Sequence, residues 1–115
     1  MTDKIVVLTT CDSQKAAAKL ARELVEARLA ACVNILPGVH SVYRWRDARG
    51  KNELEEADEW LLVIKSRRDL FAALRETIAK LHSYDIPELI ALPVVEGSEP
   101  YLAWMDQQLG AQKQP

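Results

Sequence analysis

The chain has 115 residues, of which 49% are hydrophobic and 28% are charged, and its formal net charge is −2. These totals predict a single globular domain over residues 1–115, with a frayed polar tail over 110–115. The balance of charge argues against nucleic-acid binding, which needs an excess of Lys and Arg to neutralise phosphates. No apolar run approaches the ~18 residues of a membrane span, so we expect no membrane partner.

The first segment, MTDKIVVLTT, contains an apolar run of only four residues, Ile5–Leu8. This run is too short for a signal peptide and is typical of a strand buried on both faces. We therefore expect a cytoplasmic protein, in which Cys11 and Cys32 are reduced thiols. Asp12 or Ser13 can cap a following helix. Its inward residues recur at helical spacing; they are Ala17, Leu20, Ala21, Leu24 and Val25.

The next segment, Val33 to Trp45, predicts a strand interrupted by Pro37-Gly38. Proline donates no ladder hydrogen bond, and glycine in a strand often marks a bulge. We expect one long, bent strand whose second half leaves the domain's own core. That half would carry Tyr43 and Trp45 outward to meet another chain.

A highly charged segment, Arg46–Glu59, has a basic first half, an acidic second half and Gly50 near its middle. One interpretation is a hairpin in which opposite charges face one another across the strands. The other is a solvated loop whose charges are incidental.

The second half of the chain predicts a central apolar strand over Trp60–Ile64 and a helix that starts at Ser66–Asp69. A strand over Leu89–Val95 contains Pro93, which confines it to an edge or a bulge. A last helix begins near Ser98 or Glu99, with Pro100 in its first turn. The order β-α-β-β-α-β plus a helix is that of an α+β, ferredoxin-like plait. This fold hosts many activities, so it does not decide the function.

Several short motifs occur together over nearly the whole chain: LAACVNI at 29–35, Pro37-Gly38, SVYRW at 41–45, LVIKS at 62–66, HSY at 82–84, PEL at 87–89 and YLAW at 101–104. In this order and spacing they resemble the CutA family of divalent-cation tolerance proteins. The resemblance implies a stable cytoplasmic homotrimer of ferredoxin-like subunits, assembled like the PII signal-transduction proteins. It also implies a link to copper and other divalent cations.

Two features depart from the family pattern. The segment between Trp45 and Glu59 is several residues longer than is usual in the family. In addition, Thr9 stands where some bacterial members have a metal-associated cysteine, and Leu81-His82 retains only the second of a pair of histidines. The first departure implies a reshaped or extended hairpin tip, and the second weighs against copper binding in the manner of those members.

Three residues are candidate metal ligands. His82 follows the second helix, where it can act as a ligand or as a cap for the helix. Cys11 precedes a helix N-terminus, a location that can lower the pKa of a thiol and favour metal binding. Cys32 is favoured as a buried structural thiol over a ligand. No C-x-x-C or H-x-x-x-H spacing occurs, so a copper site must be assembled from distant segments or different subunits.

A second set of residues matches positions that line the clefts between subunits in the family: Tyr43, Trp45, Lys65, Tyr84 and Glu88. We expect them to converge where the bent strand of one subunit covers the sheet of another. Two interpretations stay open. The set can form a pocket for a small anionic or polar ligand. It can also consist of interface anchors, with Lys65–Glu88 a structural ion pair.

The sequence offers little support for catalysis, since its two histidines have no obvious nucleophile beside them and its four glycines are scattered. RNA binding is disfavoured because the predicted central strands are aliphatic. The first hypothesis is a non-enzymatic homotrimer that acts in tolerance of, or response to, divalent metal cations such as copper and binds copper or another divalent cation weakly. The alternative is a PII-like sensor or scaffold that binds a small ligand in its intersubunit clefts. An enzyme with a cysteine nucleophile is a third, less favoured class.

Overall fold

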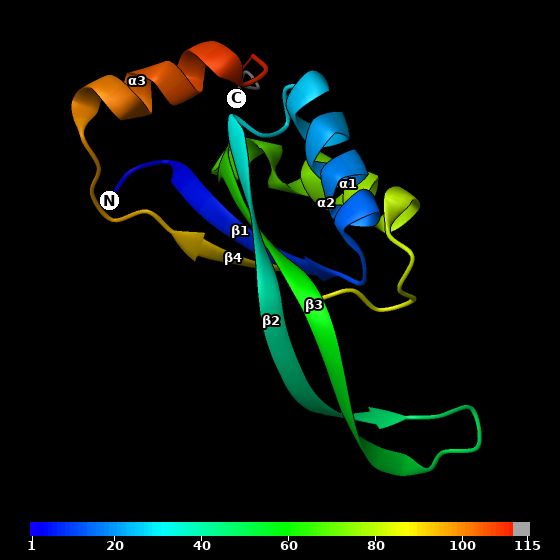
Figure 1. The fold of residues 1–115 in the computed structure, drawn as a ribbon. Helices are drawn as coiled ribbons and strands as arrows, with labels where there is room; N and C mark the ends of the chain where they lie inside the picture. Colours follow the sequence, from blue (N-terminus) through cyan, green and yellow to red (C-terminus); the bar gives the residue numbers. More distant parts are fainter. Residues whose placement is uncertain (112–115) are drawn as a thin grey trace.

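The computed structural model describes residues 1–111, which form four strands and three α-helices with one short 3-10 turn (Figure 1). In chain order the elements are β1 (Lys4–Cys11), α1 (Gln14–Glu26), β2 (Cys32–Arg46), β3 (Asn52–Arg67), η1 (Arg68–Leu70), α2 (Phe71–Leu81), β4 (Ile90–Pro93) and α3 (Glu99–Gln108).

The four strands form one antiparallel sheet in the order β2-β3-β1-β4. Helices α1 and α2 cover the same face of this sheet (Figure 1). The arrangement confirms the predicted α+β, ferredoxin-like fold and the central position of residues 60–64. The prediction that Pro93 lies on an edge strand is also confirmed, because β4 is at the edge of the sheet. There the missing N–H of proline removes no ladder hydrogen bond.

The main core lies between the sheet and the two helices. Its largest fully buried side chains come from both layers and are Val7, Leu24, Leu62, Ile64, Leu74 and Ile78. Helix α1 starts as predicted, because the Ser13 side chain accepts a hydrogen bond from the backbone N–H of Ala16 at 3.0 Å. Helix α3 lies apart and packs through Met105 and Leu109 onto a smaller apolar cluster.

The predicted start of the second helix at Ser66–Asp69 is wrong, because β3 continues through Arg67. Ser66 and Arg67 pair with Ile5 and Lys4 in the β1 ladder. The Ser66 hydroxyl donates to the carbonyl of Leu29 at 2.7 Å, and the buried Arg67 guanidinium donates to Asp69 at 2.6 Å. The pairing with β1 and these hydrogen bonds keep the backbone extended until η1.

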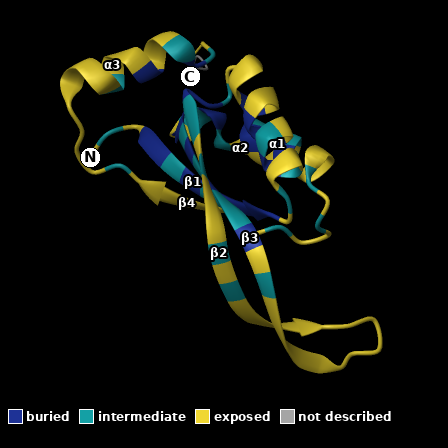
Figure 2. Cartoon of the chain, viewed as in Figure 1, coloured by how far each residue is buried: buried dark blue, intermediate teal, exposed yellow. Residues whose placement is uncertain are grey.

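Strand β2 is bent as predicted, with a shift of register between Leu36 and Val39. Gly38 has φ of 77°, a left-handed conformation that glycine adopts without a steric cost. Beyond the bulge, β2 and β3 continue as a long hairpin that projects from the body of the domain (Figure 1). Most of this hairpin is exposed (Figure 2).

The charged segment forms a hairpin, but the first of the two interpretations, in which its basic and acidic halves pair across the strands, is wrong. Arg46 lies opposite Asn52, and Arg49 and Lys51 belong to the turn. The acidic residues of β3 face other partners, since Glu55 lies opposite Tyr43 and Glu53 opposite Trp45. Two of the three basic residues therefore lie outside the ladder, and the third, Arg46, faces a neutral side chain.

The sheet face that α1 and α2 leave uncovered carries an apolar patch, with Asn34 and Lys65 beside it. By register and strand alternation it includes Val6, Leu8, Leu36, Leu61, Val63, Ile90 and Leu92. Leu36, Ile90 and Leu92 are 42–51% exposed. Helix α3 reaches only one end of this face, where Asp106 pairs with Lys4 and Arg67. We call these seven residues the open face.

The expected frayed tail begins at a residue that the structure holds in place. The Gly110 N–H donates to the carbonyl of Arg28 at 2.9 Å, and the Gly110 carbonyl accepts from Arg67 at 2.6 Å. Residues 112–115 of the expected tail lie outside the described residues.

Candidate functional site

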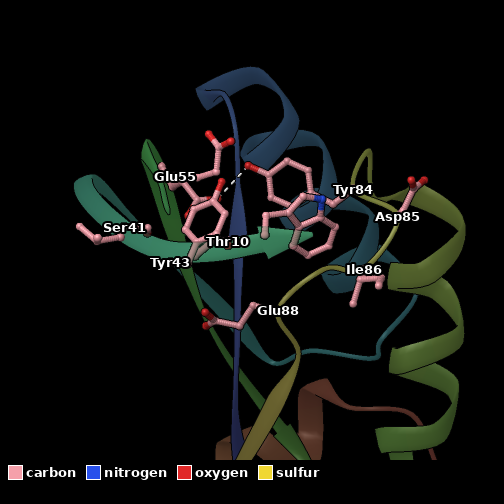
Figure 3. Close-up of a pocket in the computed structure, with 11 residues that line it drawn as sticks. Thr10, Ser41, Tyr43, Glu55, Tyr84, Asp85, Ile86 and Glu88 are labelled. Atoms are coloured by element: carbon pink, nitrogen blue, oxygen red, sulfur yellow. Dashed lines mark hydrogen bonds between the residues drawn. The ribbon is translucent and has the colours of Figure 1, made fainter. Parts of the chain in front are cut away.

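The hairpin, the end of β1 and the loop after α2 border a half-open cavity of about 610 Å³ (Figure 3). We call this cavity the hairpin pocket. Its walls combine aromatic, acidic and small side chains: Thr10, Ser41, Val42, Tyr43, Trp45, Glu55, Glu59, Tyr84, Asp85, Ile86 and Glu88.

The register of the hairpin explains how β2 and β3 supply the pocket. Tyr43 lies opposite Glu55, and Val39 lies opposite Glu59. Because side chains on a strand alternate between faces, Tyr43, Trp45, Glu55 and Glu59 all point to one face of the hairpin. This face continues the open face of the sheet.

Tyr84 closes the other side of the pocket from the loop after α2. Its hydroxyl donates to Oε2 of Glu59 at 2.8 Å, and Glu59 itself is only 7% exposed. Burial, followed by this hydrogen bond and the charge of Glu59, raises the pKa of the Tyr84 phenol well above its ordinary value. Tyr84 is therefore a hydrogen-bond donor at neutral pH.

Four of the five predicted cleft residues line this pocket, namely Tyr43, Trp45, Tyr84 and Glu88. Lys65 does not, because its ammonium group contacts the side-chain oxygen of Asn34. It lies six positions from Glu59 on β3, or about 20 Å at the usual rise of a strand. Within residues 1–111 of one chain, no Lys65–Glu88 ion pair forms.

Sequence reasoning did not single out Glu55, Glu59 or Asp85 as pocket residues. Glu55 and Glu59 alternate with outward-facing residues in the acidic half of the charged segment. This alternation was the available signal, but it gains meaning only once the register with Tyr43 is known.

Two of the three candidate metal ligands lie together. The Sγ atom of Cys11 is 4.0 Å from Nε2 of His82, at a small cavity of about 90 Å³ that Lys19 and Ser83 also line. His82 Nε2 also lies 2.7 Å from the carbonyl oxygen of Thr10, and Nδ1 accepts the N–H of Tyr84 at 3.1 Å. Since a carbonyl only accepts, Nε2 carries the proton.

The location of Cys11 before a helix, which can lower the pKa of a thiol, does not do so here. Burial raises the pKa of this thiol from 9.0 to about 11, and the negative charges of Asp12 and Glu59 add to the shift. Desolvation of the thiolate outweighs the favourable location before α1. Cys11 is therefore a protonated, unreactive thiol at neutral pH.

Cys32 lies far from the other two candidates. It pairs with Lys65 in the sheet, whereas Cys11 pairs with Trp60. These partners are five positions apart on β3, which corresponds to about 16 Å. Cys32 is half-buried, so it is more accessible than the predicted buried thiol. Both cysteines are free, and residues 1–111 contain no group of three or more His, Cys, Asp or Glu side chains suited to a metal.

Residues 5–108 match the sequence profile of the family described as CutA1 divalent ion tolerance protein. The chain belongs to this family. It is 45% identical to the "Divalent-cation tolerance protein CutA" of Thermus thermophilus, over 91% of this chain and 97% of the relative. The solved structure of that species' protein superposes with a TM-score of 0.86 and covers 93% of this chain and 99% of the other.

Two other relatives carry names that refer to a compartment. "Protein CutA, chloroplastic" of Arabidopsis thaliana is 45% identical over 88% of this chain, which spans about half (53%) of that relative's length. The solved "Periplasmic divalent cation tolerance protein CutA" of Archaeoglobus fulgidus is 32% identical, with a TM-score of 0.84 over 91% of this chain and 97% of that one. In this chain, none of the described helices is long and apolar enough to cross a membrane.

Proposed function

We propose that this CutA-family protein acts in tolerance of divalent cations, copper included, as a non-enzymatic cytoplasmic homotrimer. Its family membership supports the role in tolerance. The two free cysteines fit a reducing compartment. The observation that carries the proposal toward copper is the Cys11–His82 pair, because thiolate and imidazole are the ligands that copper prefers.

The open face supports the trimer. A large apolar surface on a monomer commonly marks a protein interface, and here Leu36, Ile90 and Leu92 are about half exposed. The projecting hairpin carries Tyr43 and Trp45 beyond the domain's own core, where aromatic side chains can anchor a neighbouring copy.

Copper binding at the Cys11–His82 pair is weak in this proposal. The thiol must lose a proton against a raised pKa, and Nε2 of His82 must lose its proton and release the Thr10 carbonyl. Further ligands would come from a neighbouring subunit, and Cys32 is the remaining thiol that could supply one.

Copper titration of the full chain tests this proposal. We expect His82→Ala and Cys11→Ser each to weaken binding by at least about tenfold, as loss of groups at a metal site typically does. His40→Ala is the matched control for the imidazole, and Cys32→Ser reports whether the second thiol takes part. Unchanged stoichiometry and affinity in both His82→Ala and Cys11→Ser would reject the assignment.

The hairpin pocket favours a second function, that of a PII-like sensor or scaffold that binds a small ligand. Its volume of about 610 Å³ lies in the range of small-molecule sites, and a few polar groups converge on an aromatic lining. In this case metal effects would be indirect. Titration with small ligands in the absence of metal separates this function from the first.

A further inference from the structure

The hairpin pocket is negatively charged. Four carboxylate side chains line it, from Glu55, Glu59, Asp85 and Glu88, and no Lys, Arg or His is among its lining residues. The sequence-based expectation of an anionic ligand depended on Lys65, which lies elsewhere in the chain. The charge of the pocket therefore favours a cation.

Glu59 needs a positive partner more than the other three carboxylates do. It is 93% buried, and Tyr84 satisfies one of its oxygens. Among residues 1–111, no Lys, Arg or His forms an ion pair with Glu59. Buried carboxylates are ordinarily paired with a charge, because removing the group from water is costly.

The aromatic residues of the pocket add a second preference. Figure 3 shows the rings of Tyr43 and Tyr84 around the same space, with Glu55 and Glu88 at its borders. Trp45 also lines the pocket. The face of an aromatic ring attracts an organic cation within about 6 Å, most strongly when the cation sheds its water.

We propose that the hairpin pocket binds a small organic cation, an amine or quaternary ammonium, with Glu59 as its counter-charge and Tyr43, Trp45 and Tyr84 around it. A hydrated metal ion fits less well, because it would leave the aromatic faces unused and finds no cluster of three ligands in residues 1–111. This inference rests on the second proposed function, a small ligand in this pocket, and does not involve the Cys11–His82 pair.

Isothermal titration of the full-length protein with choline and with 3,3-dimethylbutan-1-ol tests the proposal. The two probes have nearly the same shape, but only choline is charged. We expect choline to bind at least about tenfold more tightly than the alcohol. Only choline can make a cation–π contact with the aromatic rings and pair with the charge of Glu59. A third probe, 3,3-dimethylbutanoate, is expected not to bind.

Two variants test the assigned residues. Glu59→Gln keeps an acceptor for the Tyr84 hydroxyl but removes the charge, and Trp45→Leu removes an aromatic face; each is expected to weaken choline binding about fivefold or more. Because Trp45 is also assigned to the trimer interface, Trp45→Leu is compared with the wild type at a concentration where sedimentation shows the same assembly for both. Glu26→Gln, an exposed carboxylate on α1, is the matched control for net charge and should leave binding unchanged.

Equal affinity for choline and the alcohol would overturn the proposed preference for a cation but would still support a pocket for a small ligand. Tighter binding of 3,3-dimethylbutanoate than of choline would also overturn the preference for a cation and would still support a pocket for a small ligand. If no probe binds, the inference fails, while the second proposed function is decided separately by the metal-free titration with other small ligands. Choline binding that appears only in Lys65→Met would mean that a second copy's lysine already neutralises the pocket, which also overturns the proposal.

Discussion

Tyr84 donates its phenol hydroxyl to the buried carboxylate of Glu59 at 2.8 Å, which ties the loop after α2 to the base of the β2–β3 hairpin. The same loop places His82 against the carbonyl of Thr10 and beside Cys11. The ring of His82 in turn contacts that of Tyr84, with centroids 4.8 Å apart. Residues 82–84 thus contribute to both candidate sites. We therefore expect a substitution in one site to alter the geometry of the other.

Tyr84→Phe tests the contribution of the Tyr84–Glu59 hydrogen bond to stability. The substitution keeps the ring but removes the donor to Glu59, so it should lower the free energy of unfolding by about 1–3 kcal/mol, the usual cost of an unsatisfied buried polar group. Urea unfolding at fixed protein concentration measures the change. Tyr101→Phe is the matched control, because the Tyr101 hydroxyl makes no hydrogen bond within the described residues. Equal losses in both variants would contradict the role of the Tyr84–Glu59 contact.

Cys11 should be unusually slow to alkylate. With its pKa near 11, the thiol should react with iodoacetamide at neutral pH on the order of 100-fold more slowly than a free cysteine of pKa ~8.5. Mass spectrometry of the Cys32→Ser variant isolates Cys11, and Cys11→Ser isolates the half-buried Cys32. Alkylation of Cys11 as fast as a free thiol would reject the raised pKa and revive the cysteine nucleophile.

The same shift predicts a loss of stability in alkali. Because the folded pKa of Cys11 is raised from 9.0 to about 11, its contribution is fully present below pH 9 and declines as pH rises through about 11. Urea unfolding across this window should show a smaller decline for Cys11→Ser than for the wild type. A decline of the same size in both would contradict the assignment.

His40 on the hairpin should titrate above its ordinary pKa. Hydrogen bonds to Asp58 at 2.9 Å and to Glu56 at 2.7 Å favour the protonated ring. A raised folded pKa means that this stabilisation of the hairpin is complete below about pH 6.5 and is lost as pH rises through the folded value. NMR titration of His40 in the wild type, Asp58→Asn and Glu26→Gln checks this. Only Asp58→Asn should lower the pKa.

The sequence predicted most of the fold because its signals were local. Apolar periodicity located the elements, Ser13 located a cap, and Pro37-Gly38 located the bulge. The start of the second helix was missed because Arg67 pairs with Lys4 in the sheet and donates to Asp106 and Gly110, which are tertiary partners that no local pattern reveals.

The candidate site was predicted only in part for the same physical reason. Aromatic residues on a bent strand indicated a pocket or an interface, and Tyr43, Trp45, Tyr84 and Glu88 do surround one cavity. The position of Lys65 and the burial of Cys11 depend on register and packing. The acidic character of the pocket therefore became visible only in three dimensions.

Two separate substitutions, one on the hairpin and one on the open face, test the assembly. Trp45 is 45% exposed and lies beyond the bulge, so Trp45→Ala should weaken the trimer while leaving the subunit fold nearly unchanged. Leu92→Lys, on an edge strand of the open face, should do the same by placing a charge in an apolar contact. Sedimentation equilibrium at micromolar concentration measures the assembly, and circular dichroism the fold.

Glu26→Lys on the exposed side of α1 is the matched control and should remain trimeric. An intact trimer in both Trp45→Ala and Leu92→Lys would move the interface away from these surfaces. A folded wild-type particle of 13.0 kDa would remove the trimer itself. In that case Leu36, Ile90 and Leu92 would need another partner, because an apolar sheet face of this kind is costly to leave in water.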